Sequence, residues 1–211
     1  MNQLKFVMLL CTLPLLSACA VYRPLELQPV KRATPIAPQF SESYYYYDRD
    51  QDIYMVMRSH SKDPATGKPV EQVVTIRAFW HPIGGVTTLN PTAINATFRY
   101  LIMTPDAVGM YEGAGFIRLQ SKTGMKKFEA RVMDGDMTLT QASATFVDAI
   151  GRARINGYIK ATYDDAKAMD LILGAQREFF ARSLESKPAS ATAPATSTAP
   201  AASEPAATTE P

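Results

Sequence analysis

The feature that most constrains the fold is a strict two-residue alternation between apolar and polar side chains. From Ala153 to Ala161 every second residue is small or apolar, and the residues between them are polar or charged. Such a strand has one apolar face toward a core and one polar face toward solvent. This is typical of antiparallel sheets, because strands of parallel sheets are apolar on both faces. The alternation therefore predicts an antiparallel sheet with one face against a core.

The same period of two residues recurs in segments along the earlier part of the chain. These segments, which we expect to be strands, are 53–57, 73–80, 98–103 and 127–133. The dipeptide Asp134-Gly135 favours a tight hairpin turn, so 137–147 is predicted to run back antiparallel. Turns are also expected at Thr104–Asp106 and Gly113–Gly115, and a loop at 62–69. Seven or eight short-linked strands predict a mainly β domain, an antiparallel β-sandwich or open barrel.

One helix is expected after the last strand. Thr162 and Asp165 have the spacing of a capping box. An apolar stripe at helical spacing follows and comprises Met169, Ile172, Leu173, Gln176, Phe179, Phe180 and Leu184. We expect this C-terminal helix to cover an apolar face of the sheet; the alternative is a helix that binds in a groove of a partner protein.

The N-terminal residues predict how the protein is held in place. Lys5 precedes an apolar stretch from Phe6 to Leu16, which has the length of a signal-peptide core and is too short to span a membrane. The sequence Leu16-Ser17-Ala18-Cys19 follows, and it resembles the lipobox of bacterial lipoprotein precursors. The resemblance implies a signal peptide over 1–18, cleavage after Ala18, and acylation of Cys19 and the new N-terminus by fatty acids such as palmitate.

The resemblance also implies a location. Ala20 after the cysteine, in place of Asp, is similar to the outer-membrane sorting preference of proteobacterial lipoproteins. We therefore expect a periplasm-facing domain on the outer membrane if the host has two membranes. The alternative is that Ala18-Cys19-Ala20 serves as an ordinary signal-peptidase site, which would release a soluble secreted protein.

The mature chain divides into three parts. Four prolines between residues 19 and 43 predict an extended tether after the lipidated cysteine. Residues 44–185 form the expected single globular domain. Residues 186–211, which are mostly Ala, Pro, Ser and Thr without an aromatic residue, predict a disordered tail. With Cys11 in the signal peptide and Cys19 on lipid, no thiol remains for a disulfide, a metal or a nucleophile.

Charge and motifs limit the functions to consider. The 22 Lys and Arg against 20 Asp and Glu give a net charge of +2, too small for the field that non-specific nucleic-acid binding needs. Ser59 and Lys62 have a Ser-x-x-Lys spacing, but Pro64 forbids the helix that this catalytic pattern requires. The acidic run 48–52 lacks the glycine and the closing glutamate of a calcium loop. We therefore expect no catalytic residue, metal or cofactor.

Two binding surfaces are candidates. Trp80, beside a Gly-Gly loop, could present an aromatic platform, although its parity with Val74 and Ile76 favours a place in the core. The wet face of the last strand carries cations that an anionic envelope polymer or lipid headgroup could bind. Its residues are Arg152, Arg154, Tyr158 and Lys160, with Arg131 or Lys127 as possible neighbours.

These observations favour a lipid-anchored envelope protein with a non-catalytic β-domain that binds or braces another envelope component. The membrane, through the lipid, is one expected partner, and another envelope protein or an anionic glycan is the second. Two alternatives remain open. One is a glycan-binding module that uses the basic strand face, and the other is a small hydrolase in which His60 or His81 meets a carboxylate such as Asp52 or Glu112.

Overall fold

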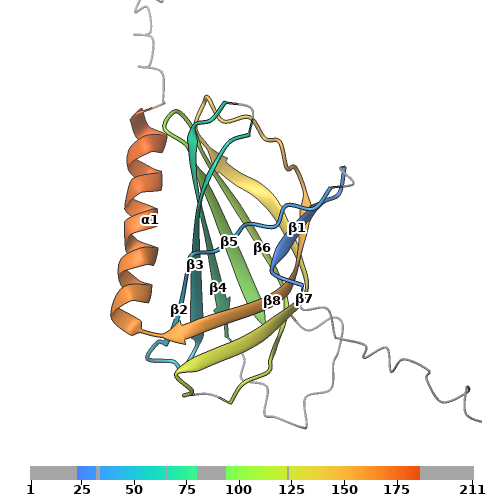
Figure 1. Ribbon diagram of the computed structural model, residues 1–211, viewed down its shortest axis with the longest axis vertical. Helices are drawn as coiled ribbons and strands as arrows, with labels where there is room; N and C mark the ends of the chain where they lie inside the picture. Colours follow the sequence, from blue (N-terminus) through green and yellow to red (C-terminus); the bar gives the residue numbers. More distant parts are fainter. Residues whose placement is uncertain (1–22, 32–33, 65, 80–93, 123, 186–211) are drawn as a thin grey trace, which may run out of the picture.

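The computed structural model describes residues 23–31, 34–64, 66–79, 94–122 and 124–185 (Figure 1). The predicted signal peptide and C-terminal tail lie outside these residues. The expectation of a mainly β domain followed by one helix is confirmed. The elements are β1 (Glu26–Pro29), β2 (Glu42–Tyr47), β3 (Ile53–Lys62), β4 (Pro69–Ala78), β5 (Ala96–Met103), β6 (Val108–Leu119), β7 (Lys127–Ala142), β8 (Ala153–Tyr163) and α1 (Asp165–Glu185).

The strands β2 to β8 close into a seven-stranded barrel. From β2 to β7 each strand pairs antiparallel with the next one in the chain, and β8 pairs antiparallel with β7. A short parallel pairing of β8 with β2, in which Tyr44 faces Thr162 and Tyr45 faces Tyr163, completes the ring. This pairing joins the first and last strands of the ring, which an open barrel or a sandwich leaves apart. The expected barrel is therefore present, but it is closed, and the sandwich alternative was wrong.

The barrel interior is packed with large side chains. Tyr45, Phe98 and Tyr100 are each almost completely buried among residues from all the strands of the ring. Two tyrosine hydroxyl groups of this interior have polar partners: the Tyr100 hydroxyl donates to the partly buried Gln72 side chain, and the Tyr111 hydroxyl donates to Oδ1 of the exposed Asp148 at 2.5 Å. The interior of the described barrel is thus a core that stabilises the ring.

The helix α1 packs on the outside of the barrel. Where β3 to β6 face α1, their outward-pointing side chains are apolar, so these strands are buried on both faces there. The outward-pointing residues are Val56, Val73, Leu101, Met103, Val108 and Met110. From α1 the contacts come from Ala168, Leu171, Ala175 and Phe179. We call this part of the surface the helix-covered wall. The expected helix therefore does cover an apolar face, but the face is the outside of a closed barrel.

The predicted buried stripe of α1 was largely wrong. Met169, Leu173, Phe180 and Leu184 are exposed, whereas Phe179 is buried and Ile172 and Gln176 are partly buried. Small side chains face the barrel instead, because they let the helix approach the strands closely. The cap also differs: Asp164 Oδ1 accepts the Lys167 backbone N–H at 3.0 Å, which makes Asp164 the N-cap residue. In the part of the chain described, no helix has the length and apolarity required to cross a membrane.

The predicted hairpin at Asp134-Gly135 was also wrong, because β7 runs through it without a turn. One extra residue is accommodated there, since Val132 pairs with Gly157 whereas Gly135 pairs with Ile155. This is a β-bulge. The predicted turn at 113–115 likewise lies inside β6, where side chains at Gly113 and Gly115 would collide with the β7 backbone. The expected turn at 104–106 and the loop at 62–69 are present.

Part of the segment expected to be an extended tether lies on the barrel. Strand β1 pairs antiparallel with β8, and Leu25 and Leu27 are buried in the core. The backbone of Leu27 exchanges hydrogen bonds of 2.8 and 2.7 Å with Ile36. The chain is therefore attached to the folded body from residue 23 onward among the residues described.

Candidate functional site

The outer faces of β1, β7 and β8 form a second part of the barrel surface, which we call the bare wall because α1 does not cover it. In Figure 1 this wall and α1 lie on opposite sides of the barrel. The bare wall carries a hollow of about 590 Å³. Its lining is polar and rich in arginine: Arg23, Gln28, Arg131, Val132, Met133, Asp134, Arg154, Asn156, Gly157 and Tyr158.

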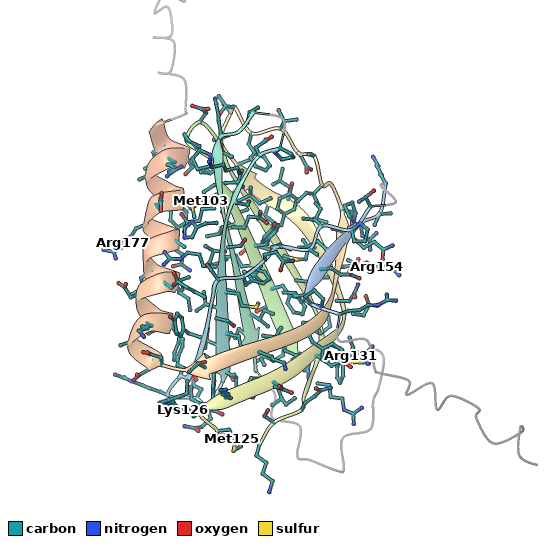
Figure 2. The ribbon with its side chains drawn as sticks, viewed as in Figure 1. Met103, Met125, Lys126, Arg131, Arg154 and Arg177 are labelled. Atoms are coloured by element: carbon teal, nitrogen blue, oxygen red, sulfur yellow. The ribbon has the colours of Figure 1, made fainter. Side chains whose placement is uncertain are left out.

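Strand β8 supplies the floor of the hollow. Its alternation places Ala153, Ile155 and Ile159 inside the barrel, so Arg154 and Tyr158 point outward, as the sequence predicts. In Figure 2, Arg154 and Arg131 lie on the side of the barrel opposite Arg177 of α1. The hollow is therefore a feature of the polar strand face that the sequence identified.

The bulge in β7 shapes one side of the hollow. Arg131 is the register partner of Tyr158, and its guanidinium carbon lies 5.2 Å from the centre of that ring, a cation–π contact. The extra residue in the bulge turns both Met133 and Asp134 outward, although they are consecutive. A regular strand would have sent one of them into the core. The bulge thus adds a second polar position beside Arg131.

The N-terminal segment forms the other side. The Tyr158 backbone N–H donates to the Arg23 carbonyl at 3.0 Å, which fixes the start of the described chain beside β8. Gly157 permits this approach: its φ of +123° suits glycine, and a Cβ there would collide with the Pro24 carbonyl oxygen. Farther along, Gln28 pairs in register with Arg154. These pairings bring the Arg23 side chain to the hollow.

The arginines of the hollow differ from most cations on the strands. Within the described ranges, no carboxylate lies within 4.0 Å of the guanidinium nitrogens of Arg23, Arg131 or Arg154. Asp134 lines the same hollow without forming such a pair. Three cations and one carboxylate therefore share this site and leave an excess of positive charge.

The other two predicted cations do not line the hollow. Arg152 is paired with Asp136 at 2.7 Å, a hydrogen bond that raises the pKa of Arg152. Lys160 lies 3.1 Å from Glu129. Of the four predicted strand residues, the structure thus brings Arg154 and Tyr158 to the hollow, whereas Arg152 and Lys160 lie outside its lining.

The remaining predicted site residues are separate from it. Trp80, His81 and Cys19 lie outside the described residues. His60 and Asp52 lie at opposite ends of β3, about 25 Å apart along an extended strand. Asp52 is buried and paired with Arg77 at 2.7 Å, and Glu112 is paired with Arg99 at 2.8 Å. The carboxylates proposed for a hydrolase therefore form ion pairs with arginines and not with His60.

The acidic run also has a structural explanation. Asp48 Oδ1 accepts the backbone N–H groups of Asp50 and Asp52 at 2.9 Å each, which stabilises the turn between β2 and β3. Among the residues with described positions, no three His, Cys, Asp or Glu side chains are grouped as metal ligands. Asp48 is thus a turn residue in this structure.

Comparisons with known proteins identify no relative for this arrangement. No protein-family model matches the chain, and no curated protein or solved structure is significantly similar to it.

Sequence reasoning missed Arg23, Gln28 and Asp134. The first two lie in the segment expected to be a tether, and their contact with β8 depends on pairings distant in the sequence. For Asp134 a signal was present: the alternating apolar side chains are even-numbered from Phe128 to Val132 but odd-numbered at Met137 and Leu139. A change of parity of this kind indicates either a hairpin or a bulge, and the Asp-Gly dipeptide favoured the hairpin.

Proposed function

We propose that this protein is a lipid-anchored envelope protein whose barrel binds an anionic component of the envelope in the hollow of the bare wall. The single observation that carries the proposal is that Arg23, Arg131 and Arg154 line one hollow and that none of them has an ion-paired carboxylate in the described part of the chain. Guanidinium groups bind phosphate and carboxylate through paired N–H donors. The proposal makes the domain a binding module that performs no reaction.

Neighbouring side chains support recognition beyond charge. Asn156 and Gln28 offer amide donors and acceptors in the same lining, and Tyr158 offers a ring and a hydroxyl group. An anion that carries hydroxyl groups, such as a uronic acid or a glycerol phosphate, would use both kinds of partner. The hollow therefore fits a small anionic headgroup or sugar unit.

The anchor is proposed from the lipobox at Leu16–Cys19. Two or three acyl chains at Cys19 would make membrane attachment stable, whereas one chain gives only marginal binding. Mass spectrometry of the N-terminal peptide from native envelopes tests this part. An acylated Cys19 is expected, and an unmodified Cys19 or a soluble protein in the medium would contradict it.

The binding proposal is tested with the full lipidated chain in neutral detergent micelles. Calorimetric titration uses two soluble anions, sn-glycerol 1-phosphate and oligogalacturonate, with neutral dextran as the uncharged control. At least one anion is expected to bind with an affinity that falls as salt is added. Arg154→Ala should weaken this binding about tenfold or more, since it removes charge-assisted hydrogen bonds.

The matched control is Arg152→Ala. It removes the same charge two residues away on the same strand face, but from a side chain that is paired with Asp136 and lies outside the lining. Less than about a twofold change in affinity is expected. Equal weakening by both variants would show a diffuse charge effect, and a lack of binding by both anions would refute the proposal.

A further inference from the structure

The position of the hollow relative to the lipid anchor indicates which anion it meets. This inference rests on the proposed function. We infer that the short connection between Cys19 and Arg23 holds the bare wall against the bilayer, so that the hollow binds the phosphate of an anionic phospholipid headgroup.

The first step is the length of the connection. Only residues 20–22 separate Cys19 from Arg23. Four Cα–Cα steps span at most about 15 Å, even when fully extended. Had the chain been extended from residue 19 to residue 43, as the sequence predicts, the domain could have stood tens of ångströms away from the membrane. In the structure only a short connection separates the domain from the lipidated cysteine.

The second step is that Arg23 is itself part of the hollow. Its carbonyl accepts the Tyr158 N–H at 3.0 Å, and the next residues continue into β1 on β8. An acylated Cys19 has its chains in the hydrocarbon and its backbone in the interfacial layer, which is about 5–8 Å thick on each side of the bilayer. The connection therefore keeps Arg23 within about 15 Å of the interfacial layer, which allows the hollow to reach the level of the lipid phosphates.

The third step is the direction in which the wall faces. The start of the chain is attached to the bare wall, whereas α1 lies on the opposite side of the barrel (Figure 1). Attachment at Arg23 therefore turns the bare wall toward the bilayer and α1 away from it. Negative surface potential from anionic lipids attracts basic groups within about a Debye length, so it would draw the side of the barrel that carries Arg131 and Arg154 toward the surface.

The charge of α1 argues against the helix as the membrane-facing surface. Helices that lie in the interface carry Lys and Arg on their polar face. Here Arg177, which points away from the barrel in Figure 2, and Lys167 are accompanied by acidic residues along the same helix. The lining of the hollow holds three arginines and one carboxylate, whereas α1 has no excess of cations.

The experiment measures how fast phenylglyoxal modifies individual arginines. The full lipidated chain is reconstituted in vesicles of phosphatidylcholine alone and in vesicles that also contain phosphatidylglycerol, and peptides are quantified by mass spectrometry. Arg131 and Arg154 are expected to react about tenfold more slowly with phosphatidylglycerol, as nearly full occupancy would give. Arg177 on α1 and the paired Arg152 serve as internal controls and should change less than about twofold.

A second variant separates membrane proximity from ligand affinity. Insertion of about twenty Gly and Ser residues between Ala20 and Val21 adds a flexible reach of about 25 Å. The protection of Arg131 and Arg154 by phosphatidylglycerol should fall severalfold in this variant, because the local concentration of headgroups drops. Binding of soluble sn-glycerol 1-phosphate in micelles should be unchanged.

The possible results distinguish failure of this inference from failure of the proposed function. Equal protection in both vesicle types would show contact without recognition of anionic lipid and would overturn the inference. No protection in vesicles, with Arg154-dependent binding of oligogalacturonate in micelles, would also overturn it and leave the proposed function standing with a glycan as ligand. No binding in either setting would refute both. Protection that survives the insertion would refute the role of the short connection.

Discussion

The helix-covered wall and the bare wall belong to one closed sheet, yet the outward side chains of the two walls have opposite chemistry. On the helix-covered wall Val56, Leu101 and Met110 point outward and are buried by α1. On the bare wall Arg131 and Arg154 occupy equivalent outward positions and stay exposed. Because side chains alternate along each strand, the inward-pointing side chains all pack in the barrel core. The outward-pointing side chains can be apolar on one strand and charged on another.

The difference indicates how stability and binding are divided. The helix-covered wall removes a large apolar surface from water, so its residues contribute to the free energy of unfolding. The bare wall exposes Arg131 and Arg154, which have no ion-paired carboxylate among the described residues; they contribute little to folding and are available to a ligand. Substitutions on the two walls should therefore affect different measurements.

The largest effect is expected for Phe179→Ala on the helix-covered wall. Phe179 is 1% exposed and packs between α1 and the strands, so its truncation should cost about 3–5 kcal/mol of unfolding free energy. The control is the adjacent Phe180→Ala, whose side chain is 50% exposed and which should cost less than about 1 kcal/mol. Denaturant unfolding measures both. Similar losses would mean that α1 is packed by a different face.

On the bare wall, Gly157→Ala should be the most disruptive change. The added Cβ would collide with the Pro24 carbonyl, and the φ of +123° is strained for alanine, so a cost of about 1–3 kcal/mol is expected. The loss should be local, because the N-terminal segment can separate from β8 while the ring stays closed. Hydrogen exchange should speed up at the backbone N–H groups of Leu27 and Tyr158. Unchanged exchange there would contradict the placement of β1.

A smaller effect is expected for Asp134→Asn. It removes the one carboxylate of the hollow, so the affinity for an anionic probe should rise about two- to fivefold. Asp136→Asn is the matched control, because Asp136 lies two residues along β7 and pairs with Arg152 outside the lining. Calorimetric titration with sn-glycerol 1-phosphate compares the two. A lower affinity for Asp134→Asn would mean that this side chain helps to bind the ligand.

The smallest effect concerns pH and the start of α1. The hydrogen bond from the Lys167 backbone N–H lowers the pKa of Asp164 below its usual 3.8 in the folded protein. A lowered pKa stabilises the fold above the unfolded-state value, and this contribution is lost as pH falls through the folded-state pKa. The unfolding midpoint should therefore decrease below about pH 4. In Asp164→Asn this decrease should be shallower, and an identical decrease would refute the assignment.

Much of the fold was predictable because alternation is local. The strands β3, β4, β5 and β8 follow from apolar side chains two residues apart, and the presence of α1 follows from apolar side chains at helical spacing. Closure of the barrel was not predictable, since it depends on two residue pairs between β2 and β8, which are more than a hundred residues apart. Nor could the buried face of α1 be found, because Ala168 and Ala175 carry little hydrophobic signal although they contact the barrel.

The candidate site, too, could be predicted only in part. Arg154 and Tyr158 could be placed on an outer face from the strand pattern alone. The strand pattern could not show which of these cations are paired with an acid. Asp136 and Glu129 reach Arg152 and Lys160 only through the register of β7 with β8. Arg23 was beyond prediction, since its place depends on the left-handed conformation of one glycine in another strand.

The most direct test of the account is a map of the ligand contacts over both walls. Backbone amide chemical shifts of the full lipidated chain in neutral micelles are followed as sn-glycerol 1-phosphate is added. The account predicts shift changes confined to β1, β7 and β8 around Arg154, with α1 unchanged, and their loss in Arg154→Ala but not in Arg152→Ala. Changes centred on α1, or spread evenly over the barrel, would contradict it.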